Sequence, residues 1–157
     1  MTLHMDATLV PSRRRALQLA GFAAFAAVLA PRMSLATEAQ VAEEMKKLFG
    51  GKAMGEGKVK LDVPEIAENG LVVPINIDVD SPMTDADFVK SVHVFADGNP
   101  LPQVVTYHFT PESGKASAST RMRLAQTQNV IAVAEMSSGA LFSAKSQVKV
   151  TIGGCGG

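Results

Sequence analysis

The sequence predicts an all-β domain preceded by one short helix, and two observations lead to this fold class. Apolar and polar residues alternate with a period of two in segments spread from Leu71 to Ile152, as they do in half-buried strands. Clusters of Gly, Pro, Asn, Asp and Ser separate these segments at regular intervals, which is typical of tight turns. Together the patterns predict about seven short strands, the number and rhythm of an immunoglobulin-like β-sandwich.

Residues 1–36 have the features of an export signal. Residues 12–15 are a serine and three arginines, residues 17–29 are apolar and uncharged, and residues 34–36 offer a cleavage site. The run of arginines resembles the twin-arginine pattern of proteins exported in the folded state, although Ala16 stands where that pattern prefers Phe. The apolar run is shorter than the ~20 residues that cross a bilayer. We therefore expect a periplasmic protein with no membrane anchor in its mature form.

Residues 37–57 are predicted to form a helix and a linker. From Thr37 to Phe49 the apolar residues recur at helical spacing, and Gly50 and Gly51 then end the helix. The apolar face consists of Val41, Met45, Leu48 and Phe49. The glycines between Gly50 and Gly57 predict the linker.

Residues 58–152 are predicted to form the sandwich. The first strand is Lys58–Val63, and alternation then marks Leu71–Val79, Ala118–Leu124 and Val148–Ile152. Three further segments, Val92–Ala96, Val104–Phe109 and Val130–Met136, are apolar on both faces, so a second sheet or a partner should cover their outer side. The turns fall at Asn69-Gly70, Ser81-Pro82, residues 97–100, residues 112–114 and residues 137–139.

Composition and charge exclude several classes of protein. Apolar residues make up 46% of the chain and charged residues 19%, with 15 basic and 15 acidic side chains. These values argue against a disordered chain, a collagen-like repeat and a basic nucleic-acid-binding domain. Residues 1–36 contain four arginines and one aspartate, so the mature chain is mildly acidic and has no electrostatic reason to bind nucleic acid or an anionic membrane.

The sequence offers few residues for a metal site or for catalysis. The mature chain has two histidines, His93 and His108, each in a predicted strand without a second ligand at i+2 or i+4. The acidic cluster at residues 78–87 lacks the Gly and Glu positions of a calcium loop. We therefore expect no metal, no cofactor and no catalytic residue.

The most informative segment is the terminus, Gly153-Gly154-Cys155-Gly156-Gly157, which contains the only cysteine of the chain. Glycine permits many backbone conformations, so residues 153–157 are predicted to form a thin, flexible arm after a strand that ends at Ile152. Cys155 would then reach ~10 Å from the domain.

The surroundings of Cys155 favour a thiol that other proteins activate. Its sequence neighbours are glycines and the terminal carboxylate, and none of these groups lowers a thiol pKa from its usual ~8.5. An accidental exposed thiol, an intermolecular disulfide and a cloning remnant are the alternatives. In an oxidising compartment a free thiol without a purpose is a liability, which favours a functional arm.

The terminus and four upstream segments together resemble the SoxY family, the sulfur-binding subunits of the periplasmic carrier in bacterial thiosulfate oxidation. The segments are LDVPEIAENG (61–70), DSPMT (80–84), STRMRLA (119–125) and VKVTI (148–152). The resemblance covers essentially the whole mature chain. It implies that Cys155 holds sulfur intermediates covalently, and that the chain is a carrier and not an enzyme.

The same resemblance implies a set of partners. They are the SoxZ subunit in a heterodimer, a c-type Sox cytochrome that couples thiosulfate to the thiol, a hydrolase that releases sulfate, and a sulfane dehydrogenase or another acceptor for the remaining sulfur. Two rival hypotheses stay open. One is a binding module whose Cys155 only crosslinks subunits, and the other is a thiol enzyme that uses Cys155 with His93 or His108.

Overall fold

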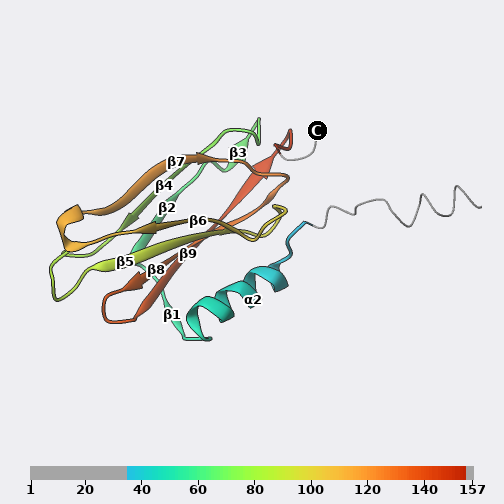
Figure 1. Cartoon of the computed structure of the whole chain (residues 1–157). Helices are drawn as coiled ribbons and strands as arrows, with labels where there is room; N and C mark the ends of the chain where they lie inside the picture. The colour runs from blue at the N-terminus through green and yellow to red at the C-terminus, as the bar shows by residue number, and fades with distance from the viewer. Residues whose placement is uncertain (1–34, 155–157) are drawn as a thin grey trace, which may run out of the picture. The chain divides into compact units, whose positions relative to one another are not determined.

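The computed structural model describes residues 35–154, which form a β-sandwich with one helix beside it (Figure 1). The larger sheet has the order β1-β9-β8-β5-β6, with β3 also paired to β9, and the smaller sheet has the order β2-β4-β7. The strands are β1 (Met54–Gly55), β2 (Val59–Asp62), β3 (Ile66–Ala67), β4 (Val73–Val79), β5 (Val89–Ala96), β6 (Gln103–His108), β7 (Ala116–Met122), β8 (Gln128–Met136) and β9 (Leu141–Val150). This architecture confirms the predicted all-β, immunoglobulin-like sandwich, and β1 and β3 add two very short strands to the predicted set.

Helix α2 (Glu38–Phe49) forms where the sequence predicts it. Thr37 caps its first turn in a capping box with Gln40, and Gly50 ends it with a left-handed backbone, at a φ of 66°. The helix lies along the outer face of the larger sheet (Figure 1). Val41 and Phe49 are buried there, but Leu48 is 45% exposed, so its place on the buried face was wrongly predicted.

The predicted linker at residues 50–57 contains a strand. Met54 and Gly55 form β1, which pairs in parallel with Leu141 and Phe142 at the start of β9. Two residues are too few to give a periodic pattern, so the sequence shows only the glycines around them.

Strand β4 shows the clearest agreement with the predicted alternation. Val73, Ile75, Ile77 and Val79 are buried and the residues between them are exposed. The strand begins two residues later than predicted, because the side-chain oxygen of Asn69 accepts a hydrogen bond from the N–H of Leu71 and turns the chain there (2.8 Å). Leu71 is consequently 47% exposed.

Strands β5 and β8 are buried on both faces, as their apolar pattern predicts. One face packs into the main core between the sheets. On the other face, Phe95 and Val133 form a second cluster with Val41 and Phe49 of α2. The helix of the same chain therefore supplies the outer cover of these two strands. Strand β6, at the sheet edge, has half-buried residues along most of its length.

Strands β7 and β9 differ from their predicted limits. Strand β7 begins and ends two residues earlier than predicted, and β9 begins at Leu141, seven residues before the predicted start. In β7 only Ala116 and Met122 are buried, and Thr120 is exposed. Strand β9 ends at Val150, two residues before the predicted end, and Ile152 is 68% exposed.

The described residues include the end of the predicted export signal. Ala36 is buried, and its N–H donates to the carbonyl oxygen of Asn99 at 2.7 Å. The rest of the signal lies outside the described range, so the cleavage site stays a prediction. Within residues 35–154 no helix is long and apolar enough to span a membrane.

Candidate functional site

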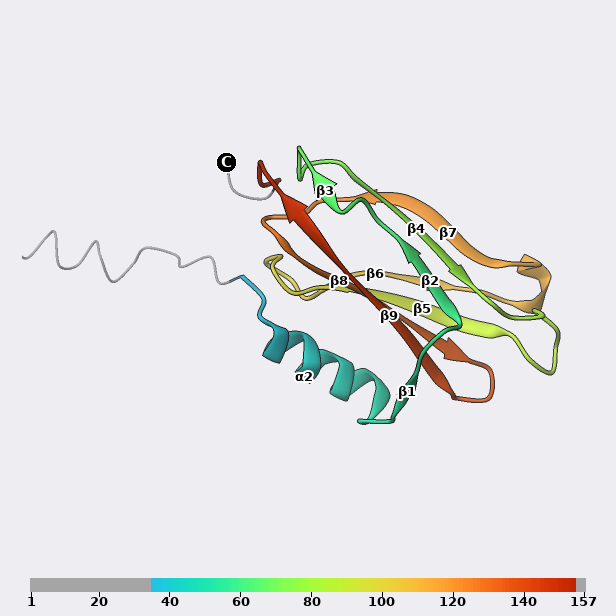
Figure 2. The same cartoon turned by 180° about the vertical axis from the view of Figure 1, so that it is seen from behind.

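The end of β9 leads to the predicted thiol arm, and the short strand β3 runs beside it (Figure 2). Lys149 and Val150 pair in parallel with β3. Beyond the strand, the N–H of Thr151 donates to the carbonyl oxygen of Ala67 at 3.0 Å, and the N–H of Gly70 donates to the carbonyl oxygen of Ile152 at 2.7 Å. The backbone therefore stays attached to the body past the end of the strand.

The attachment includes both glycines that were predicted to begin the flexible arm. The N–H of Gly154 donates to the carbonyl oxygen of Leu124 at 2.9 Å, and the N–H of Leu124 donates to the carbonyl oxygen of Gly70 at 2.8 Å. Gly154 is buried. Gly153 and Gly154, the first two residues of the predicted arm, thus lie against the sandwich in this structure. Cys155, Gly156 and Gly157 lie outside the described residues.

Close backbone contact explains why glycine stands at these positions. A Cβ on Gly153 would overlap the carbonyl oxygen of Ala125, and a Cβ on Gly154 would overlap the carbonyl group of Gly70. A Cβ on Gly70 would in turn overlap the carbonyl oxygen of Leu124. All three glycines are thus needed for close approach of three chain segments.

His93 lies in β5 beneath helix α2. Its ring contacts Phe49 edge to face and stacks on Phe95, with centroid distances of 5.2 and 6.5 Å. Its Nε2 lies 3.1 Å from the hydroxyl oxygen of Ser91, and its Nδ1 lies 3.1 Å from that of Thr106. The contacts of the ring with both phenylalanines and of both ring nitrogens with hydroxyl groups show that His93 has a structural role, packing between the sheet and the helix.

Neither histidine lies near the base of the predicted arm. Sheet pairing places His93 level with Ser143, seven residues along β9 from Val150, or roughly 23 Å. His108 is level with Leu141, nine residues from Val150, or roughly 30 Å. The structure therefore brings neither His93 nor His108 to the segment that leads to the thiol.

His93 makes the stability of the domain sensitive to acid. Burial lowers the pKa of His93 below 6.5, with further lowering from His108 and Lys90 and an opposing effect from Glu135. As pH falls below 6.5, the unfolded chain takes up a proton that the folded chain resists, so the free energy of unfolding should decrease until the pH reaches the lowered pKa.

Urea unfolding at about pH 7.5 and about pH 5.5 checks this prediction. His93→Gln should lose less stability than the unsubstituted protein over that interval, because glutamine does not titrate. An equal loss in both proteins would contradict the assignment to His93.

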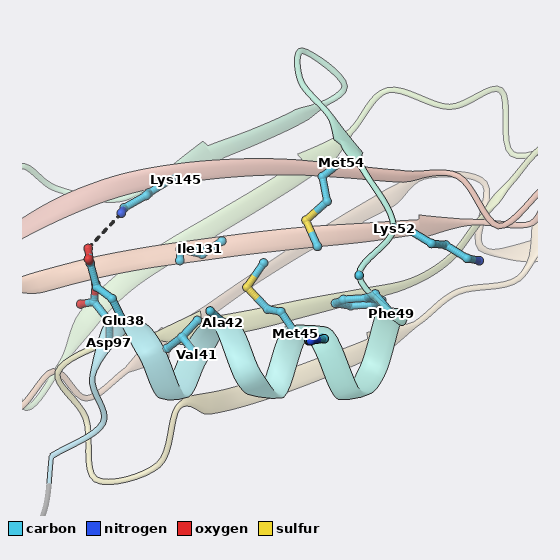
Figure 3. A pocket seen from close by; sticks show the side chains of 12 residues that line it. Glu38, Val41, Ala42, Met45, Phe49, Lys52, Met54, Asp97, Ile131 and Lys145 are labelled. Atoms are coloured by element: carbon cyan, nitrogen blue, oxygen red, sulfur yellow. Dashed lines mark hydrogen bonds and ion pairs between the residues drawn. The ribbon is translucent and has the colours of Figure 1, made fainter.

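A groove of about 420 Å³ lies between α2 and the larger sheet. Figure 3 shows Met45 and Met54 projecting into it, with Ile131 of β8 along the sheet side. An ion pair between Glu38 and Lys145 (3.3 Å) lies at one end of the groove. Of the predicted site residues, the structure describes Gly153 and Gly154, and neither lines the groove. Within residues 35–154, no group of three His, Cys, Asp or Glu side chains is arranged to hold a metal ion.

Comparison with protein families decides the identity. A family model described as "Sulfur oxidation protein SoxY" matches residues 45–155. The chain belongs to the SoxY family. The match covers most of the chain and its last residue is Cys155.

Solved structures agree with membership of the SoxY family. The chain is 30% identical to the sulfur carrier protein SoxY from Chlorobium limicola f thiosulfatophilum, with a TM-score of 0.62, over 74% of this chain and 100% of that one. Two more distant structures show the fold alone. One is a superoxide reductase from Ignicoccus hospitalis, with 15% identity and a TM-score of 0.54 over 74% of this chain and 94% of that one. The other is a putative superoxide reductase from Thermotoga maritima, with 20% identity and a TM-score of 0.52 over 68% of this chain and 89% of that one. Among the curated proteins no match was found.

Proposed function

We propose that this protein is a periplasmic covalent carrier in thiosulfate oxidation, and that the thiol of Cys155 holds the sulfur intermediates. One observation carries the proposal: the family match runs to the sole cysteine, which follows directly on the attached residue Gly154. The relative from Chlorobium, described as a sulfur carrier, supports the same role.

The loading step forms a sulfur–sulfur bond. The thiol of Cys155 and the outer sulfur of thiosulfate are joined, the thiol loses its proton, and two electrons pass to an acceptor, for which we propose a Sox cytochrome. Water then cleaves the bond between the outer sulfur and the sulfonate on a hydrolase, which releases sulfate and leaves a persulfide on Cys155. A sulfane dehydrogenase then oxidises the outer sulfur of the persulfide to a sulfonate, with water as the source of oxygen and six electrons passing to an acceptor, and the hydrolase releases it as sulfate and restores the thiol. Alternatively, a nucleophilic sulfur acceptor takes the outer sulfur and Cys155 leaves as the thiolate.

The partners supply the chemistry that the chain itself lacks. A thiol reacts as the thiolate, which is a minor species at neutral pH without a nearby cation or base. His93 and His108 are separated from the end of β9 by seven and nine residues of strand, so neither is placed to take the proton of a thiol there. We therefore propose a carrier without a resident cofactor or metal, paired with the SoxZ subunit.

Intact-mass spectrometry of the mature protein tests this function. After incubation with thiosulfate, the SoxZ subunit, the cytochrome and an oxidant, we expect the mass of the protein to increase by one thiosulfonate group. Digestion and mass mapping of the peptides should locate this group on Cys155. Adding the hydrolase should convert it to a persulfide. If only a disulfide-linked dimer forms, the chain is a crosslinked binding module, and turnover by the isolated chain would indicate a thiol enzyme.

A further inference from the structure

We infer that the backbone next to Cys155 is held in a fixed position on the sandwich, and that two buried side chains, Asn99 and Gln128, position this site. We call the site the seat, and it consists of Gly70, Leu124, Ala125, Gly153 and Gly154. The residues that follow Gly154 form the tether that carries the thiol. The inference deepens the proposed function and rests on it. It assigns the glycines before Cys155 to an anchor, and it leaves only the residues beyond Gly154 as the tether.

The seat holds the chain end from two sides. On one side, the N–H of Gly70 donates to the carbonyl oxygen of Ile152. On the other, the N–H of Gly154 donates to the carbonyl oxygen of Leu124. The hydrogen bond from the N–H of Leu124 to the carbonyl oxygen of Gly70 joins the two sides. Such a closed set of backbone hydrogen bonds defines one position for the chain end.

Two buried amide side chains hold the segment around Leu124 in place. Asn99 is 8% exposed and Gln128 is 3% exposed. The Oδ1 atom of Asn99 accepts from the N–H of Ala125 at 3.0 Å and from Nε2 of Gln128 at 2.9 Å, and its Nδ2 donates to the carbonyl oxygen of Arg123 at 2.9 Å. The two hydrogen bonds to the main chain bracket Leu124, which is the residue that binds both Gly70 and Gly154.

The second amide completes this support. Nε2 of Gln128 also donates to the carbonyl oxygen of Gln126 at 3.1 Å, and its Oε1 accepts from the N–H of Gly98 at 2.7 Å. Every buried side-chain nitrogen and oxygen in the described part of the chain has a hydrogen-bond partner. A fully satisfied buried network restricts its members to one arrangement, so it fixes the segment that receives Gly154.

The seat sets two lengths for the tether. With Gly154 seated, the proposed tether begins at Cys155, whose Cα can lie only about 3.5 Å beyond the anchor. With the seat open back to the end of β9 at Val150, Cys155 is the fifth residue after the strand and can lie about 17 Å from its end when the chain is extended. The short tether can place the thiol in a partner with a shallow active site. A partner with a deep channel can reach the thiol only after the hydrogen bonds of Thr151, Ile152 and Gly154 to the body have broken.

Two measurements on the mature chain test the seat, and the single cysteine makes the first one direct. A nitroxide attached to Cys155 reports the motion of the tether, and amide hydrogen exchange on the unlabelled protein reports the hydrogen bond of Gly70. In Gly154→Ala we expect a more mobile nitroxide and exchange at Gly70 faster by about tenfold or more. Gly157→Ala, a glycine-to-alanine change at the same terminus but outside the seat, should alter neither.

Asn99→Ala tests the positioning role. It should raise the mobility of the nitroxide and the exchange at Gly70, while the amide of Ile77 in the centre of β4 keeps its protection. A general loss of protection that includes Ile77 would show a merely structural role for Asn99. A nitroxide as mobile in the unsubstituted protein as in Gly154→Ala, or an unprotected Gly70 amide, would overturn the seat.

Sulfur loading measured on the same variants separates this inference from the proposed function. Normal loading with no sign of the seat would overturn only the seat. A seated chain end with no adduct on Cys155 under any condition would overturn the carrier function.

Discussion

Replacing Cys155 by serine will abolish sulfur loading completely and leave the unfolding temperature of the sandwich unchanged. A serine hydroxyl cannot form the sulfur–sulfur bond to thiosulfate, and the chain has no other cysteine to replace it. We expect no change in stability, because we propose that Cys155 lies on the tether beyond Gly154, and substitutions outside the core usually change stability little. Intact mass and thermal unfolding of the same samples measure both effects.

A relocated thiol provides the matched control for this experiment. Ser138 is exposed in the turn between β8 and β9, at the opposite end of β9 from the seat. The double variant Cys155→Ser, Ser138→Cys has an accessible thiol in the wrong place and should remain unloaded by the partner system. Efficient loading at residue 138 would contradict the idea that partners recognise the terminus of the chain.

Replacing Phe95 by alanine should destabilise the domain by about 3–5 kcal/mol. Phe95 is fully buried and belongs to the cluster that attaches α2 to the sheet. Its ring stacks on His93, and its cluster includes Val41 and Phe49 of the helix, so truncation leaves a cavity between the two layers. Urea unfolding at neutral pH measures the loss.

Leu101→Ala controls for the removal of an apolar side chain. Leu101 is 73% exposed, so its truncation should change the free energy of unfolding by less than about 0.5 kcal/mol. A loss below about 1 kcal/mol for Phe95→Ala would mean that the α2 interface contributes little to stability.

The sequence predicts those parts of the fold whose signal is local. The alternation from Val73 to Val79 predicts a strand with one buried face, and the structure has that burial pattern. Thr37 and Gly50 mark the ends of α2 because a helix needs a cap at each end. The double-faced apolar pattern of β5 and β8 also predicts a cover, although a pattern within a strand cannot show that α2 provides it.

The seat could not be predicted, because it depends on contacts between segments far apart in the chain. Glycine at 153 and 154 is equally compatible with flexibility and with close packing, and the sequence alone favoured flexibility. Gly70 looked like an ordinary turn residue beside Asn69, and nothing in the sequence links Asn99 and Gln128 to the chain end. The one available signal was the presence of glycine at both Gly70 and Gly154, which becomes informative only when the pairing of β3 with β9 is known.

The pairing of β9 at its two ends has a consequence for the order of folding. Its first residues bind β1 and its last residues bind β3, and both of these strands come from the first half of the sequence. Contacts of such high sequence separation form late and slowly, because a long stretch of chain must be closed into a loop first. The larger sheet therefore cannot be completed until synthesis has delivered β9, and the segment from Thr151 to Gly154 can bind the body only in a chain that has finished folding.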